Sequence, residues 1–296
     1  MTILVPVLAH IALVFMLFGW LSLARLRAVQ TGRTPFAAFE FGPASGPVIA
    51  LVHGLGHWTD AAWGRLAPLL AQRYRIVAFD LPGFGQSERP DAPYDLAFFR
   101  RIVVGVLDLL APHPIALVGH SLGGMICADV AAAIPDRIGA LVLIDPAGFL
   151  RAPRVFVKLV ASPLAERLFQ LPPSRKFVRR SLDKSVYDRG VNSPATHARA
   201  YELACDRLVR RAFGRVYSGA MQELLRLDEL HAQFGTYTKP TLIIWGKDDR
   251  FVPIKALAQV QKAYPHAAVR VFEQTAHCPM LECPTAVADT IEAFLG

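Results

Sequence analysis

The chain has 296 residues, of which 53% are hydrophobic, and its formal net charge is +8. This length is enough for one large α/β domain with an insertion, or for two domains, with a sizeable buried core. The cysteines match no zinc-binding or redox spacing, so we expect neither a disulfide scaffold nor a metal site from Cys127, Cys205, Cys278 and Cys283.

Residues 3–23 contain no Asp, Glu, Lys or Arg. A helix of about 20 apolar residues crosses the core of a bilayer, so we predict a membrane anchor over residues 1–24 and a linker over 25–35. Arginines follow this segment and none precedes it, which predicts a membrane-associated chain with its remainder in the cytoplasm. Two alternatives stay open. A signal peptide would normally carry Lys or Arg before its apolar region, and an apolar helix can also pack on its own domain or lie in the membrane interface.

Apolar runs then alternate with segments of helical spacing. Continuous apolar runs are typical of parallel strands that are buried on both faces, and they occur at 48–52, 75–79, 114–118, 140–144 and 241–245. A first strand is predicted at 36–41 and a last one at 268–272, and helices are predicted at 60–72, 96–110, 253–263 and 285–294. This alternation predicts a mostly parallel sheet with helices on both faces.

Between residues 147 and 237 the strand pattern is replaced by helical stretches and prolines. We predict a helical cap over 147–237 that lies above the carboxyl edge of the sheet, with 36–146 and 238–296 forming the core. The stretch from Arg151 to Lys239 has 17 Lys and Arg but 8 Asp and Glu, so it alone carries a charge of +9. This charge either belongs to an ordinary solvated surface or attracts an anionic bilayer. Nucleic-acid binding is not expected, because no recognition motif accompanies it.

A serine lies between a predicted strand and a predicted helix in Gly119-His120-Ser121-Leu122-Gly123-Gly124. This G-x-S-x-G pattern is typical of a nucleophile elbow, in which the tight turn strains the serine backbone and leaves no room for side chains at Gly119 and Gly123. Ser121 would then be exposed at the carboxyl edge of the sheet, where open α/β sheets bind ligands. On its own this short pattern also fits a glycine-rich turn with an idle serine.

A serine hydroxyl needs a base and the base needs an acid to fix its tautomer. His277 follows the last strand and is the predicted base, while His53, His57 and His120 lie near the same edge. Asp249 follows the strand at 241–245 and is the predicted acid, with Asp248 and Asp145 as alternatives. The order Ser121, Asp249, His277 is the one expected for this kind of fold. Backbone N–H groups of Leu55 and Leu122 are the predicted donors to an oxyanion.

These motifs give the chain a resemblance to the α/β-hydrolase superfamily over roughly residues 36 to 296. The matching stretches are His53-Gly54, Asp80-Leu81-Pro82-Gly83-Phe84-Gly85, the elbow, Gly246 to Pro253, and His277. The resemblance implies an α/β-hydrolase fold with a helical cap, and it places the acid three residues after Gly246, at Asp249. It implies no metal and no organic cofactor.

The resemblance also bears on the substrate. Dehalogenases and epoxide hydrolases of the superfamily carry aspartate at the elbow, so Ser121 argues against both. The apolar segment before a capped serine hydrolase resembles membrane-bound monoacylglycerol lipases, whereas Asp248 to Pro253 resembles the loop of meta-cleavage C–C bond hydrolases. We therefore predict a serine hydrolase of lipidic or other apolar carboxylic esters. The alternatives are a C–C hydrolase or another acyl transfer on the same triad, and a non-catalytic membrane-associated accessory protein.

Overall fold

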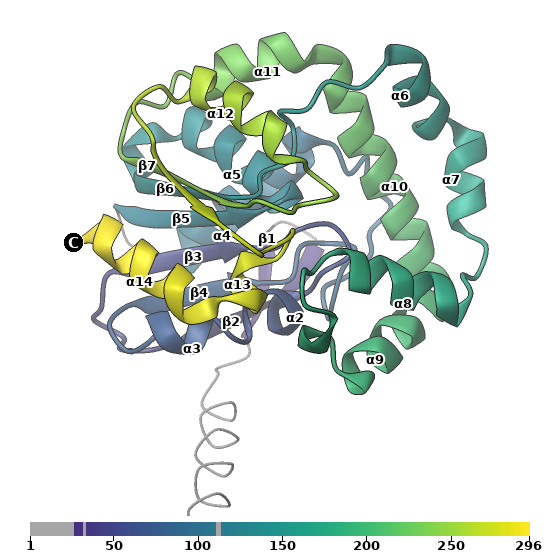
Figure 1. The fold of residues 1–296 in the computed structure, drawn as a ribbon, viewed down its shortest axis with the longest axis horizontal. Helices are drawn as coiled ribbons and strands as arrows, with labels where there is room; N and C mark the ends of the chain where they lie inside the picture. Colours follow the sequence, from purple (N-terminus) through teal and green to yellow (C-terminus); the bar gives the residue numbers. More distant parts are fainter. Residues whose placement is uncertain (1–26, 32–33, 111–113) are drawn as a thin grey trace, which may run out of the picture.

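The computed structural model describes residues 27–31, 34–110 and 114–296 (Figure 1). These residues form one eight-stranded sheet in the order β1-β2-β4-β3-β5-β6-β7-β8. The strands are β1 (Arg27–Thr31), β2 (Thr34–Phe41), β3 (Val48–Val52), β4 (Arg75–Phe79), β5 (Ile115–His120), β6 (Ile138–Ile144), β7 (Thr241–Gly246) and β8 (Ala268–Phe272). From β4 to β8 all neighbours are parallel, whereas β2 pairs antiparallel with both β1 and β4.

Alternate residues of the central strands supply two separate hydrophobic cores. One face of the sheet, with Val52 and Leu117, packs against α4 (Leu96–Leu110), α5 (Leu122–Ala133), α11 (Leu227–Phe234) and α12 (Leu257–Ala263). The other face, with Leu51 and Val118, packs against α2 (Thr59–Trp63), α3 (Ala67–Leu70), α13 (Pro279–Glu282) and α14 (Pro284–Leu295). Because both faces are buried, the central strands are apolar throughout. The predicted α/β-hydrolase fold is confirmed.

Two sequence predictions are wrong in detail. Most of the predicted linker over 25–35 is strand, because Arg27–Thr31 pairs with the edge that β2 leaves open, and its Val29 and Thr31 are β-branched. The single helix predicted at 60–72 is two short helices. The first helix ends with Gly64 as its C-cap, and the second has a proline in its first turn. Proline is tolerated in a first turn because the N–H groups there have no partner within the helix. Inside a continuous helix the same proline would remove a hydrogen bond, which favours two helices over one.

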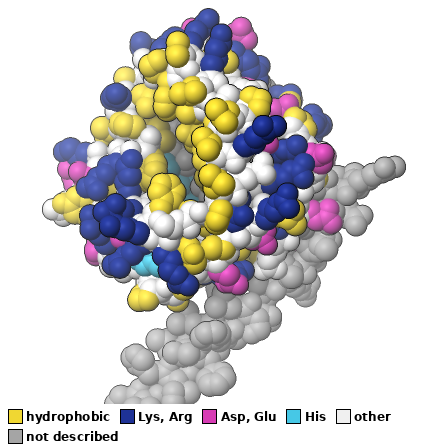
Figure 2. Space-filling model, turned by 90° about the vertical axis from the view of Figure 1, so that its right-hand side faces the viewer, with side chains coloured by type: hydrophobic (Ala, Val, Ile, Leu, Met, Phe, Trp, Pro, Cys, Tyr) yellow, Lys and Arg dark blue, Asp and Glu magenta, His cyan; other side chains and the backbone are white. Residues whose placement is uncertain are grey.

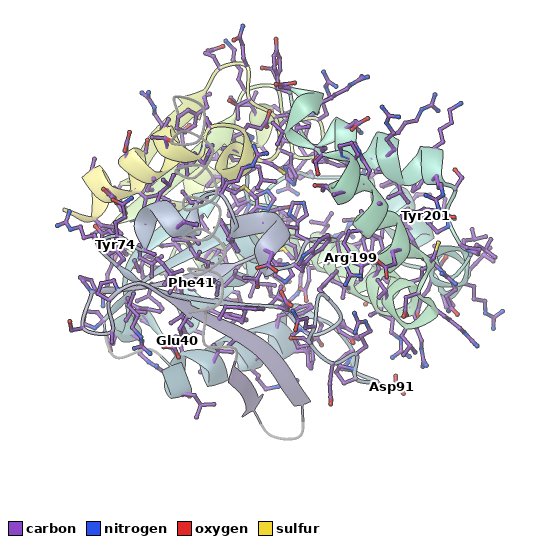
Figure 3. The ribbon with its side chains drawn as sticks, turned by 90° about the horizontal axis from the view of Figure 1, so that it is seen from below. Glu40, Phe41, Tyr74, Asp91, Arg199 and Tyr201 are labelled. Carbon is purple, nitrogen blue, oxygen red and sulfur yellow. The ribbon has the colours of Figure 1, made fainter. Side chains whose placement is uncertain are left out.

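Between β6 and β7 the chain forms helices only, so the inserted helical region is confirmed. Its helices are α6 (Arg154–Val160), α7 (Pro163–Phe169), α8 (Arg175–Lys184), α9 (Pro194–Cys205), α10 (Arg207–Glu223) and α11. Apart from α11, they lie beside the sheet rather than on its faces (Figure 1). Figure 3 shows the same separation, with Arg199 and Tyr201 in the cap and Glu40, Phe41 and Tyr74 at the sheet.

The predicted anchor over residues 1–24 lies outside the described residues. Within 27–31, 34–110 and 114–296, no helix has both the length and the apolar character that crossing a bilayer requires.

Candidate active site

Ser121 occupies a strained turn between β5 and α5. Its φ of 53° and ψ of −118° lie outside the regions that non-glycine residues normally adopt, which costs about 1–3 kcal/mol. Two backbone hydrogen bonds hold this conformation. The Ser121 N–H donates to the Ile144 carbonyl at 2.9 Å, and the Ser121 carbonyl accepts from the Ala147 N–H at 2.9 Å. The end of β6 thus fixes the serine that the sequence pattern singled out.

The two elbow glycines allow close packing around this turn. A Cβ atom at Gly123 would lie 2.2 Å from the Val52 carbonyl oxygen, so the glycine lets α5 start directly against the end of β3. A Cβ atom at Gly119 would lie 2.4 Å from the Gly123 carbonyl oxygen, within the turn itself. Since heavy atoms do not approach so closely, neither position has room for a larger residue.

His277 and Asp249 form a buried hydrogen-bonded pair. Both follow strands at the carboxyl edge of the sheet, and His277 Nδ1–H donates to Asp249 Oδ2 at 2.6 Å. The other carboxylate oxygen, Oδ1, accepts from the N–H groups of Phe251 and Val252 at 2.7 and 3.0 Å. Asp249 is therefore held by three donors. Because Nδ1 carries the shared hydrogen, Nε2 of a neutral His277 is left as a proton acceptor.

The structure brings His277 to the elbow through His120. The Nε2–H of His120 donates to the His277 carbonyl at 2.7 Å, and the two rings are 4.7 Å apart between centroids. Among the described residues, Ser121 Oγ has no hydrogen-bond partner, so the bond from Ser121 to His277 is not formed in this structure. Such bonds are often long without substrate and shorten when it binds.

The predicted oxyanion donors lie on both sides of Ser121. Leu122 is the first residue of α5, whose first N–H groups have no partner within the helix. Leu55 follows Gly54, and a Cβ atom at Gly54 would lie 3.0 Å from Ser121 Cβ. In the described part of the chain, neither the Leu55 nor the Leu122 N–H donates to another group. Both therefore remain available to a ligand.

Three further histidines surround this site and are neutral. Burial lowers the pKa of His53 and lowers the pKa of His120 well below its usual value. Burial, with the nearby His53 and His277, lowers the pKa of His57 to about 3. His53 also has a fixed role, because its Nδ1–H donates to the Gly54 carbonyl while its Nε2 accepts from the Leu81 N–H at 2.9 Å. It therefore orients the loops that follow β3 and β4.

Asp145 lies closer to the pair than the sequence indicated. It follows β6, is fully buried, and its Oδ1 accepts from the Gly246 N–H at 3.0 Å. One ligand-type atom each of Asp145, Asp249 and His277 lies within 4.8 Å of the others. Burial and the charge of Asp249 raise the pKa of Asp145 well above its usual range, which favours the neutral form of Asp145 beside Asp249. The order of strands along the chain predicts that β6 and β7 are neighbours. This adjacency was the only signal in the sequence that Asp145 lies near Asp249.

These three side chains have the ligand types of a cation site. The hydrogen bonds already described use the facing atoms of Asp249 and His277, and Asp145 is neutral. A metal ion at this position would have to displace the Nδ1 proton and break the hydrogen bond between His277 and Asp249. We interpret the group as an acid and base pair with a buried neutral neighbour.

The cap contacts the loop that carries His277. The His277 N–H donates to the carbonyl of Ser185, just beyond α8, at 3.0 Å. Glu282 bridges the same two segments, because one carboxylate oxygen accepts from the Ala276 N–H at 2.8 Å and the other from the Tyr187 N–H at 2.5 Å. We call these three bonds the Glu282 clamp. The sequence analysis missed the clamp, since no pattern links residues 95 positions apart.

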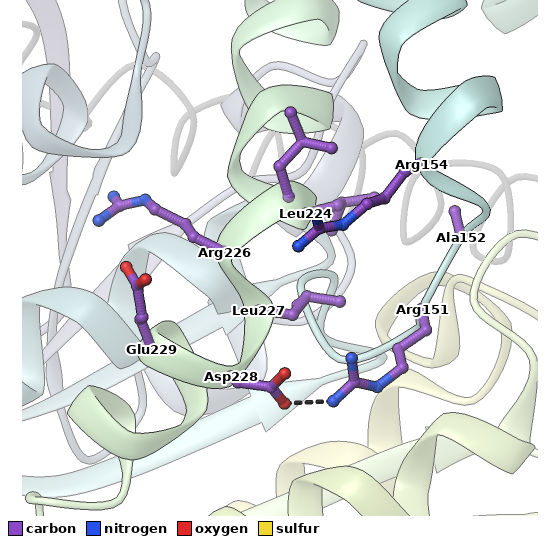
Figure 4. A pocket seen from close by; sticks show the side chains of 9 residues that line it. Arg151, Ala152, Arg154, Leu224, Arg226, Leu227, Asp228 and Glu229 are labelled. Atoms are coloured by element: carbon purple, nitrogen blue, oxygen red, sulfur yellow. Dashed lines mark hydrogen bonds and ion pairs between the residues drawn. The ribbon is translucent and has the colours of Figure 1, made fainter.

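A separate pocket lies elsewhere on the cap (Figure 4). It is formed by the segment before α6, the start of α6, and the junction between α10 and α11, and its charged lining includes an ion pair between Arg151 and Asp228. None of its residues belongs to the site described above.

Comparisons with known proteins agree with this fold. The model of the alpha/beta hydrolase fold family matches residues 47–284. A 2-hydroxymuconate semialdehyde hydrolase of Pseudomonas sp. (strain CF600) is 29% identical over 84% of this chain and 86% of its own. The structure of a 2-hydroxy-6-oxo-6-phenylhexa-2,4-dienoate hydrolase from Rhodococcus sp. strain RHA1 has a TM-score of 0.77 at 25% identity, covering 89% of this chain and 95% of that one.

A third relative differs in its reported activity. The structure of a membrane phospholipase A has a TM-score of 0.70 at 26% identity, and the match covers 99% of this chain and 96% of that chain. Proteins named for different hydrolase activities thus share the fold of this chain. The protein belongs to the α/β-hydrolase fold family.

Proposed function

We propose that this chain is a serine hydrolase that cleaves carboxylic esters of apolar acids through an acyl-enzyme on Ser121. The observation that carries the proposal is the buried 2.6 Å hydrogen bond between His277 and Asp249, beside a serine held at a φ of 53°. A nucleophile in a strained turn, a base oriented by an acid, and free backbone donors are the parts that acyl transfer requires.

The roles follow from the positions of the atoms. His277 Nε2 takes the proton from Ser121 Oγ as the oxygen attacks the ester carbonyl, and Asp249 stabilises the imidazolium that forms. The N–H groups of Leu55 and Leu122 donate to the developing oxyanion. Collapse of the tetrahedral intermediate transfers the proton from His277 to the leaving alcohol. Water then attacks the acyl-enzyme with the same base, which releases the acid and restores Ser121.

Cleavage of a C–C bond is the second candidate, because the 2-hydroxymuconate semialdehyde hydrolase is 29% identical to this chain. Support for an ester comes from the similarity to a membrane phospholipase A and from an aromatic side chain beside the base. The ring of Phe251 lies 5.4 Å from that of His277.

A substrate panel tests the proposal. Purified full-length protein is expected to react with a fluorophosphonate probe and to hydrolyse p-nitrophenyl esters, with activity that varies with acyl chain length. It is expected to cleave a vinylogous 1,5-diketone much more slowly. The reverse order of rates would identify a C–C hydrolase. A folded sample that neither reacts with the probe nor turns over any ester would contradict the proposal and favour a non-catalytic accessory protein.

Membrane association through residues 3–23 is a separate part of the proposal, supported by their uncharged sequence. Deleting residues 1–24 is expected to move the protein from the membrane pellet to the supernatant while hydrolysis of a short soluble ester stays within about twofold, since these residues precede the family match that begins at residue 47. Fractionation by ultracentrifugation and the ester assay measure both effects. Equal partitioning of the full-length and truncated forms would contradict the predicted membrane anchor.

A further inference from the structure

The cap exposes an unusual amount of apolar surface. Nine of the twelve large hydrophobic side chains that are exposed among the described residues belong to it, namely Val155, Phe156, Leu159, Leu164, Leu168, Leu171, Phe177, Tyr187 and Leu208. Single exposed hydrophobic residues are normal, but a concentration of them on one part of a molecule marks an interaction site. Five of them are 63% to 81% exposed, in α6, in α7, in the segment after it and in α8: Val155, Leu159, Leu164, Leu171 and Phe177.

Helices α6 and α7 carry apolar side chains on their solvent-exposed sides. Leu164 and Leu168 are separated by four residues in α7, so they lie on the same side of the helix. In α6, Val157 is fully buried while Phe156 and Leu159 are 49% and 63% exposed. The inner side of the cap is thus already packed against the rest of the protein. The outer apolar side chains of α6, α7 and α8 contribute nothing to that core, and we call them the cap face.

Cations surround the cap face. Figure 2 shows hydrophobic side chains in a band down this side of the molecule, with Lys and Arg on both flanks and with a hollow near its centre. Five cations of α6, α7, α8 and α10 are exposed and have no carboxylate within ion-pairing distance in the described part of the chain: Arg154, Lys158, Arg167, Lys176 and Arg207. An apolar surface with unpaired positive charge around it matches the interface of an anionic bilayer, where acyl chains lie beneath negative headgroups. A second copy of the chain would bring like charges together.

We infer that the cap face docks on an anionic lipid bilayer and receives its ester substrate from it. This inference rests on the proposed function and deepens it, because it makes the substrate a lipid ester that partitions into the bilayer. The Glu282 clamp supports this geometry, since α8 ends on the loop that bears His277. A surface that meets the bilayer is therefore joined directly to the segment that holds the base.

Two substrates test the inference with the full-length chain. One is a short p-nitrophenyl ester in solution, and the other is a long-chain ester carried in vesicles of phosphatidylcholine alone or with an equal part of phosphatidylglycerol. The wild type is expected to hydrolyse the vesicle-borne ester at least several times faster when phosphatidylglycerol is present, and high salt is expected to remove this gain. A combined L164S, L168S and F177S variant is expected to lose roughly tenfold or more on vesicles, through lost apolar burial, and to keep its rate on the soluble ester.

The matched control is L109S, which removes an exposed leucine (57%) from α4, outside the cap, and is expected to change neither rate. Equal rates on the two vesicle types, or a cap variant with an unchanged vesicle rate, would overturn the inference. A cap variant that only abolishes dimerisation in solution would assign the face to a second copy instead.

If no ester is cleaved, the proposed function fails, but amide hydrogen exchange still tests whether the cap face docks on the bilayer. Amides of α6, α7 and α8 should then exchange more slowly on vesicles with phosphatidylglycerol than on phosphatidylcholine alone.

Discussion

Replacing Ser121 with alanine is expected to abolish labelling by a fluorophosphonate and to lower kcat for a p-nitrophenyl ester by about 10⁴-fold or more, because no other group in the site can form the acyl-enzyme. The hydroxyl makes no hydrogen bond in the described part of the chain, and alanine meets the same backbone strain at a φ of 53°. The thermal midpoint should therefore stay within a few degrees of the wild type.

The control for this variant is Ser45→Ala, an exposed serine in the turn before β3, which should label and turn over as the wild type does. Mass spectrometry of the labelled protein locates the adduct. A probe bound to any residue other than Ser121, or an alanine variant that retains turnover, would contradict the assignment of the nucleophile.

Replacing Asp249 with asparagine is expected to lower kcat by about 10³–10⁴-fold, because an amide at this position favours the wrong tautomer of His277 and cannot stabilise an imidazolium. Asp145→Asn is expected to cost less than about tenfold. That carboxyl is already neutral, and the amide oxygen can still accept from the Gly246 N–H. Steady-state kinetics on one ester, together with thermal unfolding of each variant, measures the difference.

Asp248→Asn completes the series and is expected to leave kcat within about twofold, since the His277 ring hydrogen-bonds to the adjacent Asp249. Equal losses for Asp145→Asn and Asp249→Asn would mean that the negative charge is shared by both carboxyl groups in the working enzyme. A large loss for Asp248→Asn alone would move the acid to that residue.

The sequence predicted the sheet and the elbow because local signals determine them. Buried parallel strands are apolar throughout, and the G-x-S-x-G pattern places a serine at a strand end, so both could be located without knowledge of the distant contacts. The loops that carry Asp249 and His277 also follow strands, and parallel strands end at one edge of a sheet. Their approach to each other therefore followed from topology. The assignment of all three side chains as a triad remains a prediction for the variants above to test.

Features that depend on long-range packing were not predicted. The strand at Arg27–Thr31 forms because β2 has an open edge, and the residues themselves carry only a weak strand preference. Asp145 was predicted only as an alternative acid, because nothing local indicates that a neighbouring strand places it beside Asp249. The apolar residues of α6 and α7 fit the helical pattern of the cap, but only the packing shows that they face outward.

The Glu282 clamp has a consequence for how the cap can move. The segment after α8 accepts from the His277 N–H and donates to Glu282, which also holds the Ala276 N–H, so we expect movement of that end of the cap to disturb the position of the imidazole. Among the described residues, α6 and α7 have no such bonds with the loop, so we expect them to be freer to move than the end of α8. We therefore expect the cap to open at α6 and α7, while the hydrogen bonds beside His277 keep its imidazole aligned with Asp249.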